Sequence, residues 1–239
     1  MHRFAARGKS RGLPIRDALS SVDHLIYHLS VRSDPKKAAT FTQSARRAQI
    51  VAAAIEVIAE VGWAQTSIRK IADRVGVAMS AVLYHFGTKD NLVEAIIEEM
   101  YRAALSVVGP AVDAESTAAN KLAAYIRSSV AYFDTHRSHL TALTQLATSY
   151  QPADGRRFEE LGLTPELTQK LAVLDPTGIL TAGQLDQEFG DFPVASMAVA
   201  LRGAVNAVVE KILREPGFDA RAYGEDLVAI FGRVVAVNR

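Results

Sequence analysis

Hydrophobic residues recur at intervals of three and four over most of the chain from Ser44 onward. This spacing places them on one face of an α-helix, and glycines interrupt it where helices are expected to end. The first such face stops at Gly62 and consists of Ile50, Val51, Ala54, Ile55, Ile58 and Val61. Two short faces follow over residues 67–75 and 77–86, and a longer one begins after Thr88. The N-terminal part therefore predicts a long helix, two short helices and then another long helix.

The same periodicity continues toward the C-terminus and is broken by loops that contain proline and glycine. Further helices are expected at residues 122–133, 140–146, 158–174, 179–189, 194–213 and 227–237. No segment of useful length alternates apolar and polar residues as a half-buried strand does. The sequence predicts an all-α fold in which a three-helix N-terminal unit precedes a larger C-terminal helical domain.

The two short helices have the spacing of a helix-turn-helix. Ala72 is small where the helices cross, Gly76 suits a turn that needs a positive φ, and Val82 anchors the second helix. The outer face of such a second helix fits the major groove of DNA, which is about 12 Å wide. We therefore expect a DNA-binding domain over residues 41–90 and a helical domain over residues 91–239.

Composition excludes several classes of protein. Apolar residues make up 49% of the chain and charged residues 22%, as in ordinary globular domains. The absence of cysteine excludes a disulfide scaffold, a thiolate metal site and a thiol nucleophile. No apolar run approaches the roughly 20 residues that cross a bilayer, and no secretory signal follows the basic N-terminus. We expect a cytoplasmic protein with no membrane partner.

Charge is distributed unevenly along the chain. Residues 1–40 carry eight Lys/Arg and three Asp/Glu, whereas residues 92–239 carry 13 and 19. A basic front on an acidic body suggests an end that binds a polyanion, although chance and a solvated tail explain the same charges. Residues 1–40 also lack clear periodicity, and we expect them to form a basic, flexible N-terminal extension.

A longer motif runs through residues 46–101, RRAQIVAAAIEVIAEVGWAQTSIRKIADRVGVAMSAVLYHFGTKDNLVEAIIEEMY. It contains a first helix that ends in Gly62 and an aromatic residue, then Thr/Ser-x-Arg-x-Ile-Ala, Gly-Val, Tyr-His-Phe and Thr-Lys-Asp-x-Leu. This segment, about a quarter of the chain, resembles the DNA-binding region of TetR-family transcriptional regulators along its full length. The resemblance implies a homodimer that binds double-stranded DNA, with a C-terminal domain for ligand binding and dimerisation.

The resemblance assigns DNA contacts to both short helices and to the start of the next helix. The residues concerned are Thr66, Ser67, Arg69, Met79, Ser80, Leu83, Tyr84, His85 and Lys89. Lys89 corresponds to a phosphate contact, where a cation and the N–H groups of a helix start both suit an anion. Arg69 corresponds to a contact with a base edge or a phosphate. A merely solvated Lys89 is the alternative.

The second short helix corresponds to the recognition helix of the family. Met79, Ser80 and Leu83 face outward and are expected to meet base edges in the major groove. Tyr84 and His85 end this helix, where the family uses them on the DNA backbone or to fix the helix end. A buried, hydrogen-bonded His85 with a purely structural role is the alternative.

The chain departs from the family pattern at two positions of the recognition region. Many members have serine or threonine at Ala78 and tyrosine at Leu83, and both side chains bind phosphate. Leu83 offers only apolar contact, for example with a thymine methyl group. We hypothesise that the basic extension compensates by entering the minor groove or following the phosphates. Alternatively, translation starts at Val31 from a non-standard codon, which leaves a short basic arm, since no methionine lies between Met1 and Met79.

The helical domain is where the resemblance implies a small-molecule effector and a dimer interface. Candidate residues of an apolar pocket are Tyr101, Leu105, Tyr125, Phe133, Leu143 and Met197, each of which also suits an ordinary core. Two chains are expected to pair through residues 193–214 and 220–237 as a four-helix interface. The helix over residues 89–108 is the expected lever, because its first turn touches DNA and its far end borders the pocket.

Other clusters of reactive side chains favour no catalytic chemistry. His136 and His139 share a helix face near Asp134, as a metal site requires, but no second cluster accompanies them and a helix-end role is commoner. Phosphate-binding glycine loops and the motifs H-E-x-x-H and G-x-S-x-G are absent. We expect no metal, no cofactor and no enzymatic activity.

The sequence thus predicts a repressor that a small apolar ligand releases from a palindromic operator. Two recognition helices related by two-fold symmetry would meet half-sites about one helical turn apart. A ligand-independent regulator or an activator of the same fold is the alternative, and a helical small-molecule-binding protein or enzyme is a more distant one.

Overall fold

The computed structural model describes residues 41–153, 155, 161 and 163–237. Within these residues the chain forms helices, and Phe189 forms an isolated antiparallel bridge with Ala236. The α-helices are α2 (Phe41–Val61), α3 (Ile68–Val75), α4 (Met79–Phe86), α5 (Lys89–Asp113), α6 (Ala118–Thr135), α7 (Arg137–Ser149), α8 (Pro165–Lys170), α9 (Thr177–Leu185), α10 (Val194–Arg214) and α11 (Ala220–Val235), and the 3-10 helices are η1 (Trp63–Gln65) and η3 (Leu171–Leu174). The all-α prediction is confirmed for the described residues, and the expected basic extension over residues 1–40 lies outside them.

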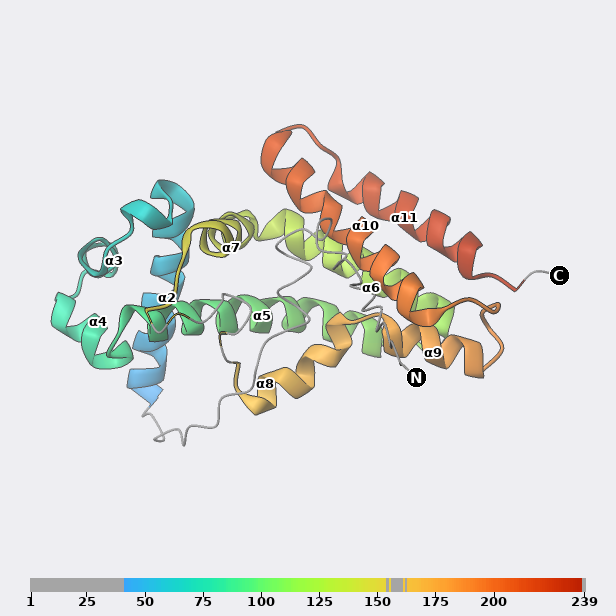
Figure 1. Ribbon diagram of the computed structural model, residues 1–239, viewed down its shortest axis with the longest axis horizontal. Helices are drawn as coiled ribbons and strands as arrows, with labels where there is room; N and C mark the ends of the chain where they lie inside the picture. Colours follow the sequence, from blue (N-terminus) through green and yellow to red (C-terminus); the bar gives the residue numbers. More distant parts are fainter. Residues whose placement is uncertain (1–40, 154, 156–160, 162, 238–239) are drawn as a thin grey trace, which may run out of the picture.

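The helices form two groups joined by α5. Helices α2, α3 and α4, here called the head, lie at one end of the molecule in Figure 1. Helices α6, α9, α10 and α11, here called the body, lie at the other end, where α10 and α11 run side by side. Helix α5 runs from the head into the body, and α7 packs across α2. A small helical unit therefore precedes a larger one, as the pattern of apolar residues predicts.

The turn between α3 and α4 has the geometry of a helix-turn-helix. Gly76 ends α3 with φ 74° and ψ 40°, a left-handed conformation that glycine adopts without strain. The N–H of Val77 donates to the carbonyl of Ala72 at 3.0 Å, which closes the end of α3. Ala72 and Val82 are both buried where the helices approach each other. The predicted helix-turn-helix is confirmed.

Side-chain caps fix where the head's helices begin. Ser67 Oγ accepts a hydrogen bond from the N–H of Lys70 at 3.2 Å and starts α3. Thr88 Oγ1 accepts from the N–H of Asn91 at 3.1 Å and starts α5. These caps satisfy N–H groups that a helix start leaves without a partner. The orientation of α4 relative to α5 is thus set by a turn that consists of Gly87 and the capping Thr88.

Helix α5 extends further than the sequence predicts. The expected lever ends near Val108, but α5 continues through Pro110 to Asp113. Proline removes one backbone hydrogen bond from a helix, whereas Val108 and Val112 are both buried in the body core on either side of it. The helix therefore continues past the proline with an apolar side chain packed into the body core on either side of it.

Two large apolar cores lie one in each group, and α5 contributes to both. The head core contains Ile55, Ile71 and Val82, and it also includes Ala142 and Leu146 from α7. The body core consists of side chains from α6, α9, α10, α11 and the last turns of α5. The head is therefore packed against α7 as part of one core, and this packing limits how freely the head can turn.

The segment between α8 and α10 differs from its prediction. The helix expected over residues 179–189 ends at Leu185, because Gln187 has φ 60° and reverses the chain. The N–H of Phe189 then donates to the carbonyl of Gly183 at 2.9 Å. Of the helix expected over residues 158–174, the described part forms α8 and η3 from Pro165 onward. No helix of the described residues is long and apolar enough to cross a membrane.

The close approach of Phe189 to Gly183 yields a prediction about stability. A methyl group on Gly183 would overlap the buried ring of Phe189, so Gly183→Ala should lower the free energy of unfolding by about 1–3 kcal/mol. Gly178 lies in the same helix with open space around it, so Gly178→Ala should raise the free energy by up to about 1 kcal/mol. Urea unfolding of both variants measures the difference, and equal stabilities would contradict this account.

Candidate DNA-binding surface and effector cavity

Helix α4 turns one face inward and the other to solvent. Val82 and Phe86 are buried and fix the helix on the head core. On the outer side, Leu83 is 44% exposed and Tyr84 75% exposed, and Met79 lies beside them. Apolar side chains held open on a short, rigid helix are a sign of a contact surface. The arrangement agrees with the outward orientation predicted for Met79 and Leu83.

The remaining predicted contact residues have mixed positions. Ser67, Arg69 and Ser80 are exposed, and His85 is half-buried. Thr66 is different, because its side chain is only 5% exposed and its hydroxyl donates to the carbonyl of Gly62 at 2.8 Å. A hydroxyl used in this way fixes the turn between α2 and α3. We therefore propose a positioning role for Thr66 in place of a direct DNA contact.

Lys89 is held in place by the aromatic side chain beside it. Its Nζ lies 3.8 Å from the centre of the Trp63 ring and 3.3 Å from the carbonyl oxygen of Thr66, to which it donates. Partial burial lowers the pKa of Lys89 from its ordinary value, and an ammonium over an aromatic ring is stabilised by the ring's quadrupole. The Lys89 ammonium is therefore held at the start of α5 by contacts within the protein.

A second set of contacts ties this cation to the end of α7. The hydroxyl of Tyr150 donates to the Asp90 carboxylate at 2.6 Å, and the N–H of Ala153 donates to the same carboxylate at 3.1 Å. The ring of Tyr150 also meets the ring of Trp63 edge-on, with centroids 5.1 Å apart. Sequence reasoning did not find this junction, because Trp63, Asp90 and Tyr150 come from three separate helical regions. The only part of the junction that is visible in the sequence is that Lys89 and Asp90 are neighbours.

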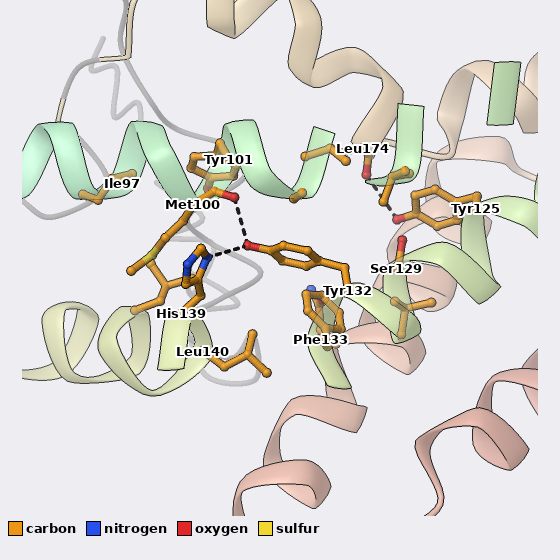
Figure 2. Close-up of a pocket in the computed structure, with 15 residues that line it drawn as sticks. Ile97, Met100, Tyr101, Tyr125, Ser129, Tyr132, Phe133, His139, Leu140 and Leu174 are labelled. Atoms are coloured by element: carbon orange, nitrogen blue, oxygen red, sulfur yellow. Dashed lines mark hydrogen bonds between the residues drawn. The ribbon is translucent and has the colours of Figure 1, made fainter. Parts of the chain in front are cut away.

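A cavity of about 90 Å³ lies between α5, α6, α7 and α10. Its wall is mainly apolar and aromatic, and consists of Ile97, Met100, Tyr101, Ala104, Val108, Tyr125, Ser129, Tyr132, Phe133, His139, Leu140, Leu143, Leu174, Val205 and Asn206. Figure 2 shows these side chains converging from the surrounding helices. The sequence candidates Tyr101, Tyr125, Phe133 and Leu143 are among them.

Two sequence candidates lie elsewhere. Leu105 packs against the head core, since it falls just beyond the edge of the α5 face that carries Tyr101, Ala104 and Val108. Met197 packs against the body core near the start of α10. It precedes Val205, the first wall residue from α10, by about 12 Å along the helix axis. Neither side chain lines the cavity.

Hydrogen bonds fix two tyrosines of the wall. Tyr132 donates its hydroxyl proton to the carbonyl of Met100 at 3.0 Å and also lies 3.1 Å from His139 Nδ1. Because that single proton is used on Met100, the His139 Nδ1–H must donate to the tyrosine oxygen. Tyr125 donates to the carbonyl of Leu174 at 3.1 Å, so η3 is held over the cavity.

Asp134, His136 and His139 make stacking, hydrogen-bond and ion-pair contacts with neighbouring side chains. His136 stacks on Tyr132 with ring centroids 4.4 Å apart, and the Asp134 carboxylate pairs with Arg137 at 2.6 Å. Burial lowers the pKa of His139, with the nearby His136 acting in the same direction. The part of the chain that the structure describes contains no group of three or more His, Asp or Glu side chains that could hold a metal ion.

Comparison with known proteins bears on the helix-turn-helix. Residues 50–96 match the model of a family described as bacterial regulatory proteins, tetR family. The matched segment contains α3, α4 and the exposed face described above. This segment of the chain is similar to the DNA-binding region of the TetR family.

Curated relatives are similar to only part of this chain. The chain is 36% identical over 67 residues to the HTH-type transcriptional regulator BetI of Ectopseudomonas mendocina. This aligned segment covers 28% of this chain and 34% of that protein. It is 49% identical over 53 residues to an HTH-type transcriptional repressor of Mycobacterium tuberculosis, covering 22% and 28%. The chain thus spans about a third of the length of these curated relatives.

Solved structures extend the likeness over most of the chain. The transcriptional regulator FadR from Bacillus subtilis, in complex with stearoyl-CoA, superposes with a TM-score of 0.63 at 24% identity. The match covers 77% of this chain and 96% of that one. At this identity the likeness shows a shared TetR-type fold.

The junction of Tyr150 and Asp90 yields a second prediction. Tyr150→Phe keeps the ring against Trp63 but removes the hydroxyl from Asp90, which should lower the free energy of unfolding by about 1–3 kcal/mol. Trp63 is the single tryptophan of the chain, so its fluorescence during urea unfolding provides the measurement. The control is Tyr84→Phe, whose ring is largely exposed and which should change stability by less than about 0.5 kcal/mol. Equal effects of the two substitutions would refute the role of the junction.

Proposed function

We propose that this chain is a sequence-specific DNA-binding transcriptional regulator that acts in the cytoplasm as a homodimer. We further propose that it is a repressor, and that a small apolar ligand releases it from a palindromic operator. The observation that carries the proposal is the rigid outer face of α4, with Met79, Leu83 and Tyr84 exposed on a helix-turn-helix. The match of residues 50–96 to the TetR family model supports the same conclusion.

In this proposal α4 enters the major groove of DNA. Ser80 and Met79 meet base edges near the start of the helix, and Leu83 gives an apolar contact suited to a thymine methyl group. Tyr84 and Lys89 lie where the backbone passes, and both can donate to phosphate oxygens. The support from the structure is that Lys89 is already oriented by Trp63 at the capped start of α5.

A second copy of the chain is proposed to cover α10 and α11. Both helices bury their inner faces in the body core, yet they also carry large apolar side chains that are exposed. These side chains are Val199 and Leu213 on α10 and Ile230 and Val234 on α11. An isologous pairing of these faces would bury them and would present two copies of α4 to a palindrome.

The cavity is proposed to hold the effector because its wall is shared by α5 and α7, the two helices that reach the head. A ligand that moves His139 or Leu143 would shift α7, whose far end bears Tyr150 against Asp90. The spacing of the two heads would then change, provided that the ligand binds the two states unequally. FadR, which shares the fold, is known in complex with stearoyl-CoA.

A regulator that needs no ligand is the second candidate. The observation in its favour is the size of the cavity, since about 90 Å³ is less than the roughly 150 Å³ of a cavity that admits benzene. Under this alternative the cavity is a packing void, and operator binding does not respond to small molecules.

Selection of bound sequences from a random pool of double-stranded DNA tests the proposed function. Enrichment of a palindrome with half-sites about one helical turn apart is expected, and failure to enrich any palindrome would refute the proposal. Binding of the selected operator should weaken steeply as salt concentration rises, because phosphate contacts release counterions.

Two substitutions separate a neutral phosphate contact from a charged one. Leu83→Tyr should tighten operator binding by about three- to tenfold with an unchanged salt slope, because a phenol donates a hydrogen bond without adding charge. Lys89→Ala should weaken binding and reduce the salt slope by about one. Fluorescence anisotropy over a range of salt concentrations measures both quantities. Lys121→Ala on α6 is the control, and a Leu83→Tyr variant no tighter than wild type would argue against a phosphate beside this position.

The dimer prediction concerns the outer face of α11. Val234→Glu places a charge on the proposed interface and should convert the dimer to a monomer, since an unpaired buried charge costs several kcal/mol. Sedimentation velocity measures the change. Leu83→Glu, a control with a similarly exposed side chain on α4, should remain dimeric. A dimeric Val234→Glu variant would mean that the chains pair through another surface.

A further inference from the structure

The wall of the cavity carries no ionised side chain. None of the residues that line it is Asp, Glu, Lys or Arg. Burial lowers the pKa of His139, which favours the neutral imidazole. Burial also raises the pKa values of Tyr101 and Tyr132 well above their usual range, so both remain phenols. A charged ligand in this cavity would lose its hydration without gaining an opposite charge.

Two of the four hydroxyl groups that line the cavity already have partners. Tyr132 uses its proton on the carbonyl of Met100, and Tyr125 uses its proton on the carbonyl of Leu174. Ser128, the neighbour of Ser129 on α6, donates to the carbonyl of Ala124 within its own helix at 2.6 Å. These groups are satisfied by the protein and hold the wall together.

Ser129 differs from these groups, and so does Tyr101, whose hydroxyl also has no hydrogen-bond partner among the described residues. Ser129 is the smaller of these two side chains. It is only 7% exposed, it lines the cavity, and its hydroxyl has no hydrogen-bond partner among the residues that the structure describes. Figure 2 shows it on α6 between Tyr125 and Tyr132, at the edge of the space that the aromatic rings enclose. Leaving a hydroxyl without a partner in an apolar site is unfavourable, so this group is suited to a hydrogen bond with a bound molecule.

We propose that the effector is an uncharged, mainly hydrocarbon molecule with one oxygen that hydrogen-bonds to the Ser129 hydroxyl. This inference rests on the proposed function for the role of the cavity, and it adds the chemical class of the ligand. A carbonyl or ether oxygen accepts the serine proton, and an alcohol or phenol either accepts or donates. The apolar remainder of the molecule lies against the aromatic and aliphatic wall.

A ligand with a six-membered ring exceeds the resting cavity of about 90 Å³ and must displace part of the wall. Met100 is the side chain best suited to move, because methionine is unbranched and has several rotatable bonds. Its backbone carbonyl also receives the Tyr132 hydroxyl, which is linked in turn to His139 on α7. Ligand entry at this point therefore acts on both α5 and α7.

Isothermal titration calorimetry with two matched sets of probes tests the proposal on the full chain. One set is para-cresol, toluene, para-toluate and para-methylbenzylammonium, and the other is octanol, octanoate and octylammonium. Within each set, the neutral oxygen-containing probe should bind at least about tenfold more tightly than either ion. Tighter binding of an ion than of the neutral probe, or no binding by any probe, would overturn the proposal.

The variant Ser129→Ala isolates the hydrogen bond. It should weaken binding of para-cresol and octanol by about three- to tenfold and leave toluene binding unchanged, because toluene has no oxygen. The matched control is Ser128→Ala, which removes a hydroxyl of similar burial that bonds within its own helix and should leave all affinities unchanged. Unaltered binding of para-cresol by Ser129→Ala would contradict the proposal.

The outcome is separable from that of the proposed function. If the neutral probes bind and no palindrome is enriched from random DNA, the ligand class stands and the regulator role fails. If a palindrome is bound and no neutral probe binds, the regulator role stands and the ligand class fails.

Discussion

The structure depends on the sharing of α5 between two apolar cores. The first half of this helix fills the head core together with α2 and α7, and its last turns fill the body core through Val108 and Val112. Neither core can rearrange without moving buried side chains of the same helix, and close-packed interiors resist such changes. The position of the head relative to the body therefore depends on α5. This helix continues through Pro110 without a break.

Helix α7 provides a second connection between the cavity and the start of α5. Its first turns carry His139 and Leu143 to the cavity, and the residue that follows its last turn, Tyr150, meets Trp63 and Asp90 beside Lys89. The cavity and the start of α5, where Lys89 lies, are thus connected through both α5 and α7. A two-state change needs such a connection, because a ligand acts only through contacts that differ between the states.

The sequence predicts elements that are coded locally and misses contacts made between distant segments. Ala72, Gly76 and Val82 fixed the helix-turn-helix in advance, because a crossing and a positive φ each demand a particular residue type. Leu105 and Met197 share the apolar character of true wall residues, and only the rotation and crossing of the helices place them in the cores. The sequence did not predict a role for Ser129, because only the folded structure shows that its hydroxyl has no hydrogen-bond partner among the described residues.

The packing of α7 on α2 has a consequence for the exchange of parts between regulators. Ala142 and Leu146 belong to the head core although they follow it by many residues in the chain. A head transplanted from a relative would meet the α7 surface of this chain, and mismatched volumes there would open cavities or force strain. Under the proposed function, operator specificity is therefore inherited as a unit with the α7 side chains that face α2, and the two surfaces are expected to vary together during evolution.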